Sequence, residues 1–195
     1  EEIKKDGLKV NLWITGHSLG GALATLFYAR LLKTNLNGLC DYCTLQDVVT
    51  FASPAVGDHH FAAELHSLMN DPRNKSRRLW RVVLKDDIVP KLPYRACEKW
   101  MRKYSYSYDV LMNYVQVGNK ITIRDKNYLS LGGEETNEDY CKRYNSSIIS
   151  TSFGKSILVI PTLFYCIENH RSRSYIKALN DCSKGTQEID VLDEL

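Results

Sequence analysis

The chain has 195 residues, which is long enough for one domain with a substantial core. Hydrophobic residues make up 44% and charged residues 25%, as in an ordinary globular protein, and the net charge of +3 is too small to predict nucleic-acid binding. The longest apolar run, residues 157–167, is too short to span a bilayer and contains Pro161, so we expect no transmembrane segment.

The first predicted elements are a strand and a helix. Residues 9–15 are rich in Val, Leu, Trp and Ile and predict a buried strand. Residues 21–33 carry apolar side chains at helical spacing and predict a mostly buried helix that packs across a sheet.

Later elements alternate in type. Residues 47–53 and 79–84 predict strands, and residues 58–69 between them predict a helix. Residues 114–124 contain two extended runs around a Gly-Asn pair, which predict a hairpin or a bent strand. Strands that alternate with helices favour an α/β fold with a parallel sheet.

The C-terminal part is less regular. The polar residues 125–150 predict a long surface excursion, and the apolar residues 157–167 predict a buried strand or helix. A short terminal helix is expected to begin over residues 175–179, and residues 183–195 form a polar, acidic tail. We therefore expect a domain at residues 1–182 followed by that tail.

The turn between the first strand and helix has the pattern Gly16-His17-Ser18-Leu19-Gly20, which is the G-x-S-x-G nucleophile elbow. Ser18 must sit at a sharp, strained turn, and we expect a side chain at position 16 or 20 to collide with the neighbouring strand or helix. The Leu19 N–H, at the start of the helix, can stabilise a developing oxyanion.

A serine hydroxyl is a poor nucleophile at neutral pH, so Ser18 needs a base that is itself oriented by an acid. In the α/β-hydrolase arrangement the order along the chain is Ser, then Asp or Glu, then His. The histidines that follow Ser18 are His59, His60, His66 and His170.

Three motifs in order resemble the core of class 3 lipases, which are triacylglycerol-lipase-like α/β-hydrolases. They are Gly16-His-Ser-Leu-Gly-Gly-Ala-Leu-Ala24, Phe51-Ala-Ser-Pro-Ala-Val-Gly57 and Arg81-Val-Val-Leu-Lys-Asp-Asp-Ile-Val-Pro-Lys-Leu-Pro93. The resemblance covers about residues 9–124, with a weaker match at residues 168–179. It implies an α/β-hydrolase fold, of which this chain holds the C-terminal half of a mostly parallel sheet with flanking helices.

The resemblance also implies the partners of Ser18. The family's acid maps onto Asp87, with Asp86 as its rival. The base maps onto His170, which opens a segment that runs to Leu179. His59 and His60 precede Asp87, which is the wrong order for the base, and the resemblance favours a packing and hydrogen-bonding role for His17.

No metal or cofactor is expected. Asp58, His59 and His60 are clustered, but no third ligand is spaced to complete a metal site. Cys40-Asp-Tyr-Cys43 is a single C-x-x-C pair without a second pair at zinc spacing.

Few residues precede the first strand, whereas class 3 lipases place several strands, the second oxyanion donor and a lid upstream of the elbow. We therefore expect upstream strands to be missing, as the first residue, Glu1, also indicates. The strand at residues 9–15 would then be an apolar edge with unpaired N–H and C=O groups, which predicts self-association. The compartment, secreted or cytoplasmic, stays open.

The function that the resemblance implies is hydrolysis of lipid esters, acylglycerols or phospholipids, through an acyl-serine intermediate at a lipid–water interface. His170 would remove the Ser18 proton, and Asp87 would stabilise the resulting imidazolium. The alternative is an inactive lipase-like scaffold, or an incomplete fragment, that acts through protein–protein contacts. A thioesterase or acyltransferase would share the same three residues.

Overall fold

The computed structural model of the chain describes residues 10–34, 43–74, 77–92, 114–125, 128–132, 159–184 and 188–191. They form one mixed sheet in which the strands lie side by side in the order of the sequence. The first four strands are parallel, β5 runs antiparallel to β4, and β6 is parallel to β5. The strands are β1 (Val10–His17), β2 (Cys43–Phe51), β3 (Leu79–Leu84), β4 (Asn119–Asp125), β5 (Tyr128–Gly132) and β6 (Glu188–Val191).

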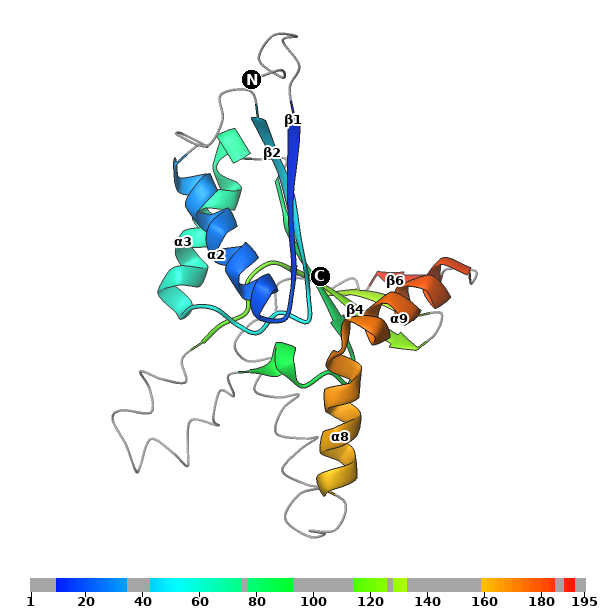
Figure 1. The fold of residues 1–195 in the computed structure, drawn as a ribbon. Coiled ribbons are helices and arrows are strands. Elements are labelled where there is room, and N and C mark those ends of the chain that lie inside the picture. The colour runs from blue at the N-terminus through cyan, green and yellow to red at the C-terminus, as the bar shows by residue number, and fades with distance from the viewer. Residues whose placement is uncertain are drawn as a thin grey trace, which may run out of the picture.

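Helices cover both faces of this sheet (Figure 1). α2 and α3 pack on one face, while α9 packs on the other face and α8 extends away from the sheet. The helices are α2 (Leu19–Thr34), α3 (His59–Asn70), α8 (Val159–His170) and α9 (Ser172–Lys184), with short 3₁₀ turns η1 (Pro72–Asn74) and η2 (Val89–Lys91). The predicted α/β fold with a parallel sheet is confirmed.

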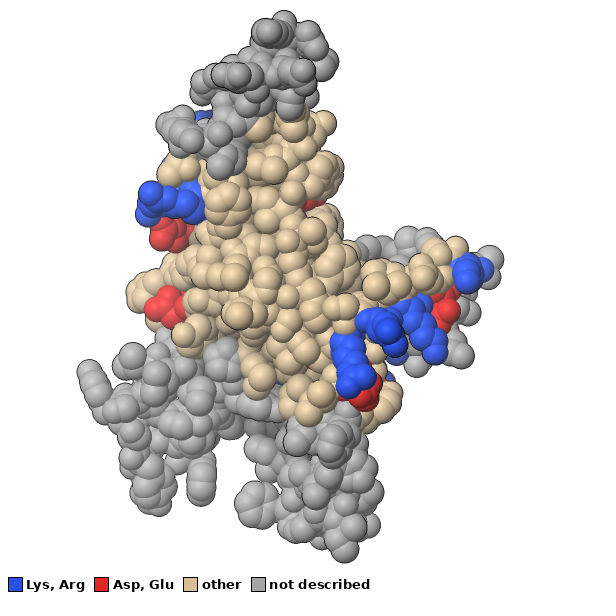
Figure 2. All heavy atoms as spheres, in the orientation of Figure 1, with Lys and Arg blue, Asp and Glu red and all other residues tan. Residues whose placement is uncertain are grey.

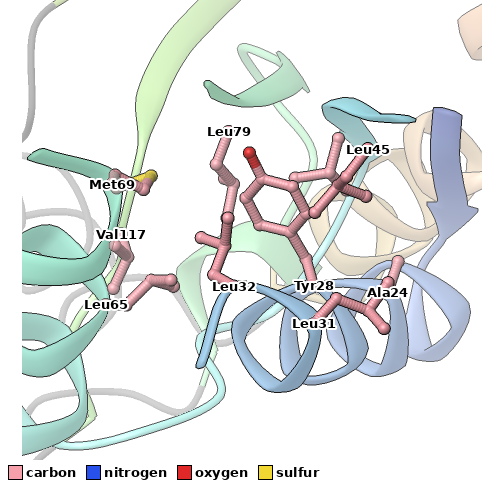
Figure 3. Close-up of a cluster of buried hydrophobic side chains, with 10 residues drawn as sticks. Ala24, Tyr28, Leu31, Leu32, Leu45, Leu65, Met69, Leu79 and Val117 are labelled. Atoms are coloured by element: carbon pink, nitrogen blue, oxygen red, sulfur yellow. The ribbon is translucent and has the colours of Figure 1, made fainter. Parts of the chain in front are cut away.

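The larger core lies between the sheet and the pair α2 and α3 (Figure 3). Tyr28 and Leu32 of α2 meet Leu45 of β2 and Leu79 of β3, and all four side chains are buried. Helix α2 buries Gly21, Ala22, Ala24 and Thr25 as well. These small residues let the helix axis lie close to the sheet, so the start of α2 is held against the strands.

A second core lies on the opposite face, under α9. Val82 and Leu84 of β3 and Ile123 of β4 pack there against Tyr175 and Cys182 of α9. This core fixes α9 against the strand end that precedes Asp87.

The predicted elements at residues 9–84 are confirmed with boundaries shifted by a few residues, and β3 coincides with the predicted strand. Two expectations of burial are wrong. β1 alternates between half-buried and exposed residues, with Trp13 61% exposed. Leu19, Leu23 and Phe27 of α2 are exposed as well, because no described element covers the outer face of that helix.

The two extended runs at residues 114–124 do not form a hairpin. Val115 makes an isolated antiparallel bridge with Gly57, and Gly118 turns the chain with a φ of 92° before β4 begins. A Cβ at Gly118 would lie 2.3 Å from the Leu79 side chain, so glycine is required there. The hairpin lies later, between β4 and β5, inside the segment predicted as a surface excursion.

The C-terminal elements are helical. Residues 159–167 of the apolar run form most of α8, but Tyr165 and Ile167 are exposed rather than buried. α9 begins three residues earlier than predicted and continues to Lys184, and β6 lies within the predicted tail, where it pairs with β5. The domain boundary after residue 182 stays a prediction, and Cys40 lies outside the described residues.

Among the described strands, β1 lies at one edge of the sheet. Figure 2 shows few charged side chains over β1 and α2, while Lys and Arg side chains gather over α9. Self-association through this edge stays a prediction. Within the described residues, no helix is both long and apolar enough to cross a membrane.

Candidate active site

Ser18 lies in the turn between β1 and α2, and its backbone is in the left-handed region with a φ of 58°. A non-glycine residue in this region is strained and persists only where its surroundings hold it. The Ser18 N–H donates to the Phe51 carbonyl at the end of β2 (2.9 Å), and the Ser18 carbonyl accepts from Gly21 (2.9 Å). The neighbouring strand and the first turn of α2 therefore fix the elbow.

The two glycines of the motif differ in what surrounds them. A Cβ at Gly16 would lie 2.2 Å from the Gly20 carbonyl oxygen, so no side chain fits there. A Cβ at Gly20 would meet no described atom within 4 Å, so the expected collision at Gly20 is wrong. The tight contact falls one residue later, because a Cβ at Gly21 would lie 2.8 Å from the Ser53 Cβ.

Two other elements bring Asp87 and His170 to the elbow. Asp87 follows β3, in the turn that the Asp87 N–H closes on the Leu84 carbonyl (3.1 Å). His170 is the last residue of α8, where the chain turns into α9. Parallel strands end at the same edge of a sheet, which is why residues after β1 and β3 meet there.

The three side chains form a continuous chain of hydrogen bonds. The His170 Nε2 atom lies 2.8 Å from the Ser18 Oγ atom. The His170 Nδ1 atom lies 3.2 Å and 3.1 Å from the two carboxylate oxygens of Asp87. The carboxylate can only accept, so the proton of the neutral imidazole belongs on Nδ1, and Nε2 is left to accept from Ser18.

The Asp87 carboxylate is fully buried and surrounded by donors. Besides His170, the Val89 N–H donates to Oδ1 (2.9 Å) and the Tyr175 hydroxyl donates to Oδ2 (2.7 Å). Hydrogen bonds of this kind stabilise a buried charge, which would otherwise be costly. Asp86, by contrast, is half-buried and makes no side-chain hydrogen bond to a described residue.

Tyr175 is a member of this network that the sequence did not single out as a site residue. Its hydroxyl donates to Asp87 and accepts from the Leu84 N–H (3.1 Å) at the end of β3. Burial raises the pKa of Tyr175 well above its ordinary value, and the negative charge of Asp87 raises it further. The hydroxyl therefore stays protonated and remains a donor to Asp87 at neutral pH.

Replacing Tyr175 by phenylalanine is expected to lower the free energy of unfolding by about 1–3 kcal/mol, because Asp87 and the Leu84 N–H each lose a buried partner. Urea unfolding measures this change. Tyr28→Phe is the matched control, since the buried Tyr28 hydroxyl has only a long 3.5 Å contact with the Arg78 carbonyl. Equal losses in the two variants would contradict this role of Tyr175.

The Leu19 N–H lies at the N-terminus of α2, where the first N–H groups have no partner within the helix. Among the described residues it donates to no other group, so it is available next to the Ser18 hydroxyl. The Leu19 side chain is 69% exposed. Leu19 therefore offers two things next to Ser18: an N–H donor that no other described group uses, and an exposed apolar side chain.

His59, His60 and His66 lie on α3, and none of them bonds to Ser18 or Asp87. Asp58 caps this helix by accepting from the His60 and Phe61 N–H groups (3.0 Å each), and the rings of His59 and His60 contact each other. The ligand atoms of Asp58, His59 and His60 lie within 4.8 Å of one another, in keeping with their clustering in the sequence. The capping bonds already account for Asp58, and a helix N-terminus disfavours a cation.

Comparison with known proteins bears on the N-terminal half of the chain. Residues 1–97 match the family model described as lipase (class 3). Over these residues the chain belongs to the class 3 lipase family. The match includes Ser18 and Asp87 and ends before His170, so the position of His170 beside Ser18 is independent of the match.

Individual relatives match a similar length of the chain. The chain is 37% identical to triacylglycerol lipase OBL1 of Ricinus communis over 90 residues, which are 46% of this chain and 16% of that protein. It is 37% identical to phospholipase A1-II 4 of Oryza sativa subsp. japonica over 87 residues, 44% of this chain and 19% of that protein. The chain thus matches less than a fifth of the length of either relative.

A solved structure of lipase II from Rhizopus niveus is 26% identical, with a TM-score of 0.40. The alignment covers 58% of this chain and 33% of that structure.

Proposed function

We propose that the protein is a serine hydrolase that cleaves carboxylic esters of lipids through an acyl-serine intermediate. The observation that carries this proposal is the hydrogen-bonded chain from Ser18 through His170 to the buried Asp87. Membership of the class 3 lipase family supports the ester-hydrolase chemistry, and the relatives named as triacylglycerol lipase and phospholipase A1 support a lipid substrate.

In the first half of the reaction, the Ser18 Oγ atom attacks the ester carbonyl carbon while its proton passes to the His170 Nε2 atom. The imidazolium that forms is held at Nδ1 by the Asp87 carboxylate. The Leu19 N–H donates to the carbonyl oxygen as it gains negative charge. His170 then gives its proton to the leaving alcohol, which leaves the acyl group on Ser18.

In the second half, His170 takes a proton from water, and the water oxygen attacks the acyl carbon. The same N–H group holds the second oxyanion, and the proton returns from His170 to Ser18 as the carboxylic acid departs. Each step balances without a metal or a redox partner.

A lipid substrate agrees with exposed apolar side chains on the two helices that adjoin Ser18 and His170. Leu19 directly follows Ser18 and is 69% exposed, and Leu23 lies one turn further along α2 and is also exposed. Tyr165 and Ile167 are exposed on α8, which ends at His170. Exposed apolar side chains on both elements favour contact with an acyl chain or a lipid–water interface.

Ester hydrolysis by the purified protein tests this proposal. We expect release of p-nitrophenol from long-chain esters, and of fatty acid from emulsified triacylglycerol or phospholipid, with activity that rises when an interface is present. Ser18→Ala should reduce the rate to background. A folded protein that hydrolyses none of these esters, or activity that survives Ser18→Ala, would overturn the proposal, and the former result would favour an inactive scaffold.

A further inference from the structure

The side chain of His17 reaches across the site to the backbone of His170. The His17 Nε2 atom lies 2.9 Å from the His170 carbonyl oxygen. A carbonyl oxygen only accepts, so His17 carries a proton on Nε2 and donates it. His17, which directly precedes Ser18, is therefore hydrogen-bonded to His170, whose ring faces the Ser18 hydroxyl.

The carbonyl that His17 bonds lies at the end of a helix. His170 is the last residue of α8, and the last four carbonyl groups of a helix have no partner within it. Other donors serve the same turn, since the Arg171 N–H (3.2 Å) and the Ser174 hydroxyl (2.8 Å) both donate to the Glu168 carbonyl. Among the described residues, the donor to the His170 carbonyl comes from the elbow itself.

The His17 ring also packs against the two residues that orient the site. Its centroid lies 5.0 Å from that of His170, with the rings tilted, and 5.7 Å from that of Tyr175 in an edge-to-face contact. His17 is half-buried. One imidazole thus contacts His170 through both a hydrogen bond and its ring face.

We propose that His17 is a positioning residue that holds the His170 ring within hydrogen-bonding distance of the Ser18 hydroxyl. Because His17 and Ser18 are adjacent in one strained turn, a bond from His17 to the end of α8 fixes the distance between the nucleophile and its base. The expected effect of His17 on kcat rests on the proposed function, whereas its effect on the position of His170 does not. His17 does not touch the reacting atoms, so its effect passes through His170.

Two substitutions separate the hydrogen bond from the ring contact. His17→Phe keeps an aromatic ring beside His170 and Tyr175 but removes the donor, and we expect kcat to fall about 10- to 100-fold with little change in KM. His17→Gln places an amide donor at a similar reach and should restore most of kcat. His66→Phe, on the exposed surface of α3, is the control for loss of a histidine and should hydrolyse esters like the wild type.

The tautomer of His170 gives a readout that does not need ester hydrolysis. Two-bond ¹H–¹⁵N correlation spectra, with His170 assigned from a His170→Gln variant, should show the Nδ1–H form in the wild type. Without the His17 bond the His170 ring can shift relative to Asp87, so His17→Phe should show a mixture of tautomers in protein that remains folded by circular dichroism. His17→Gln should return the single form.

These two readouts distinguish failure of the inference from failure of the proposed function. An active wild type whose His17→Phe variant keeps both kcat and the His170 spectrum would overturn the positioning role. A wild type that hydrolyses no ester would overturn the proposed function, and the His170 spectrum alone would then decide the role of His17. A fall in kcat that His17→Gln does not restore, with the spectrum unchanged, would also count against the hydrogen bond.

Discussion

Replacing Asp87 by asparagine is expected to lower kcat for ester hydrolysis by about 10⁴-fold, the size of loss seen when a buried triad aspartate is changed to asparagine in another serine hydrolase. The amide of asparagine can donate to the His170 Nδ1 atom, which would favour the tautomer with its proton on Nε2. Nε2 lies 2.8 Å from the Ser18 oxygen and could then no longer accept the Ser18 proton.

The adjacent aspartate supplies a matched control. Asp86→Asn makes the same chemical change one residue away, at a half-buried side chain without a hydrogen bond to a described residue. Because substitutions away from packed or bonded features usually change free energies by less than 0.5 kcal/mol, kcat should stay within about twofold of wild type. Steady-state kinetics on both variants measures this difference, and a larger loss in Asp86→Asn would transfer the acid's role to Asp86.

A substitution at the elbow, Gly16→Ala, is expected to have a large effect on the free energy of unfolding. Gly16→Ala should lower the free energy of unfolding by at least about 3 kcal/mol, the upper part of the range for overpacking, because the new Cβ would lie 2.2 Å from the Gly20 oxygen. The colliding atoms belong to the backbone, so relief requires moving β1 or α2. Either movement would displace Ser18, and activity should fall together with stability.

Gly20→Ala should act in the opposite direction. Its Cβ meets no described atom within 4 Å, and replacing glycine by alanine inside a helix gains about 0.5–1 kcal/mol. Urea denaturation of both variants, compared with wild type, tests the pair. Similar losses in the two variants would show that both glycines are required by packing, as the motif alone suggests.

The glycines illustrate where sequence reasoning succeeded and where it could not. The order of strand, turn and helix around Ser18 was predictable, because apolar periodicity and the elbow pattern are local signals. Which glycine is crowded depends on how closely α2 approaches the strands, a tertiary distance. The pattern treats Gly16 and Gly20 alike, although in the structure the close contacts are at Gly16 and Gly21.

For the partners of Ser18 as well, the sequence indicates candidates and only the fold selects among them. The motif indicates Asp87 with Asp86 as an open alternative, and only the fold shows which carboxylate faces the histidine. His170 lies 83 positions after Asp87, so no local spacing joins them. Tyr175 carried no separate signal, because a tyrosine on a helix that faces the core has an ordinary packing explanation. For His17 the resemblance favours packing and hydrogen bonding, but only the fold shows that its partner is the His170 carbonyl.

The exposed surfaces were the least predictable. The composition of β1 and α2 indicates burial, yet Trp13, Leu19 and Leu23 are more than half exposed. Burial depends on what covers a face as well as on the residues within it. α8 shows the same effect, since its apolar sequence predicted a buried element but Tyr165 is exposed.

The most direct test of the central claim, that His170 activates Ser18 as a nucleophile, is to treat the protein with a fluorophosphonate and map the adduct by peptide mass spectrometry. We predict one adduct, on Ser18, in the wild type, with labelling lost in His170→Ala and in Ser18→Ala while both variants remain folded. An adduct on another residue, no adduct on well-folded wild-type protein, or full labelling of Ser18 in His170→Ala would contradict the account.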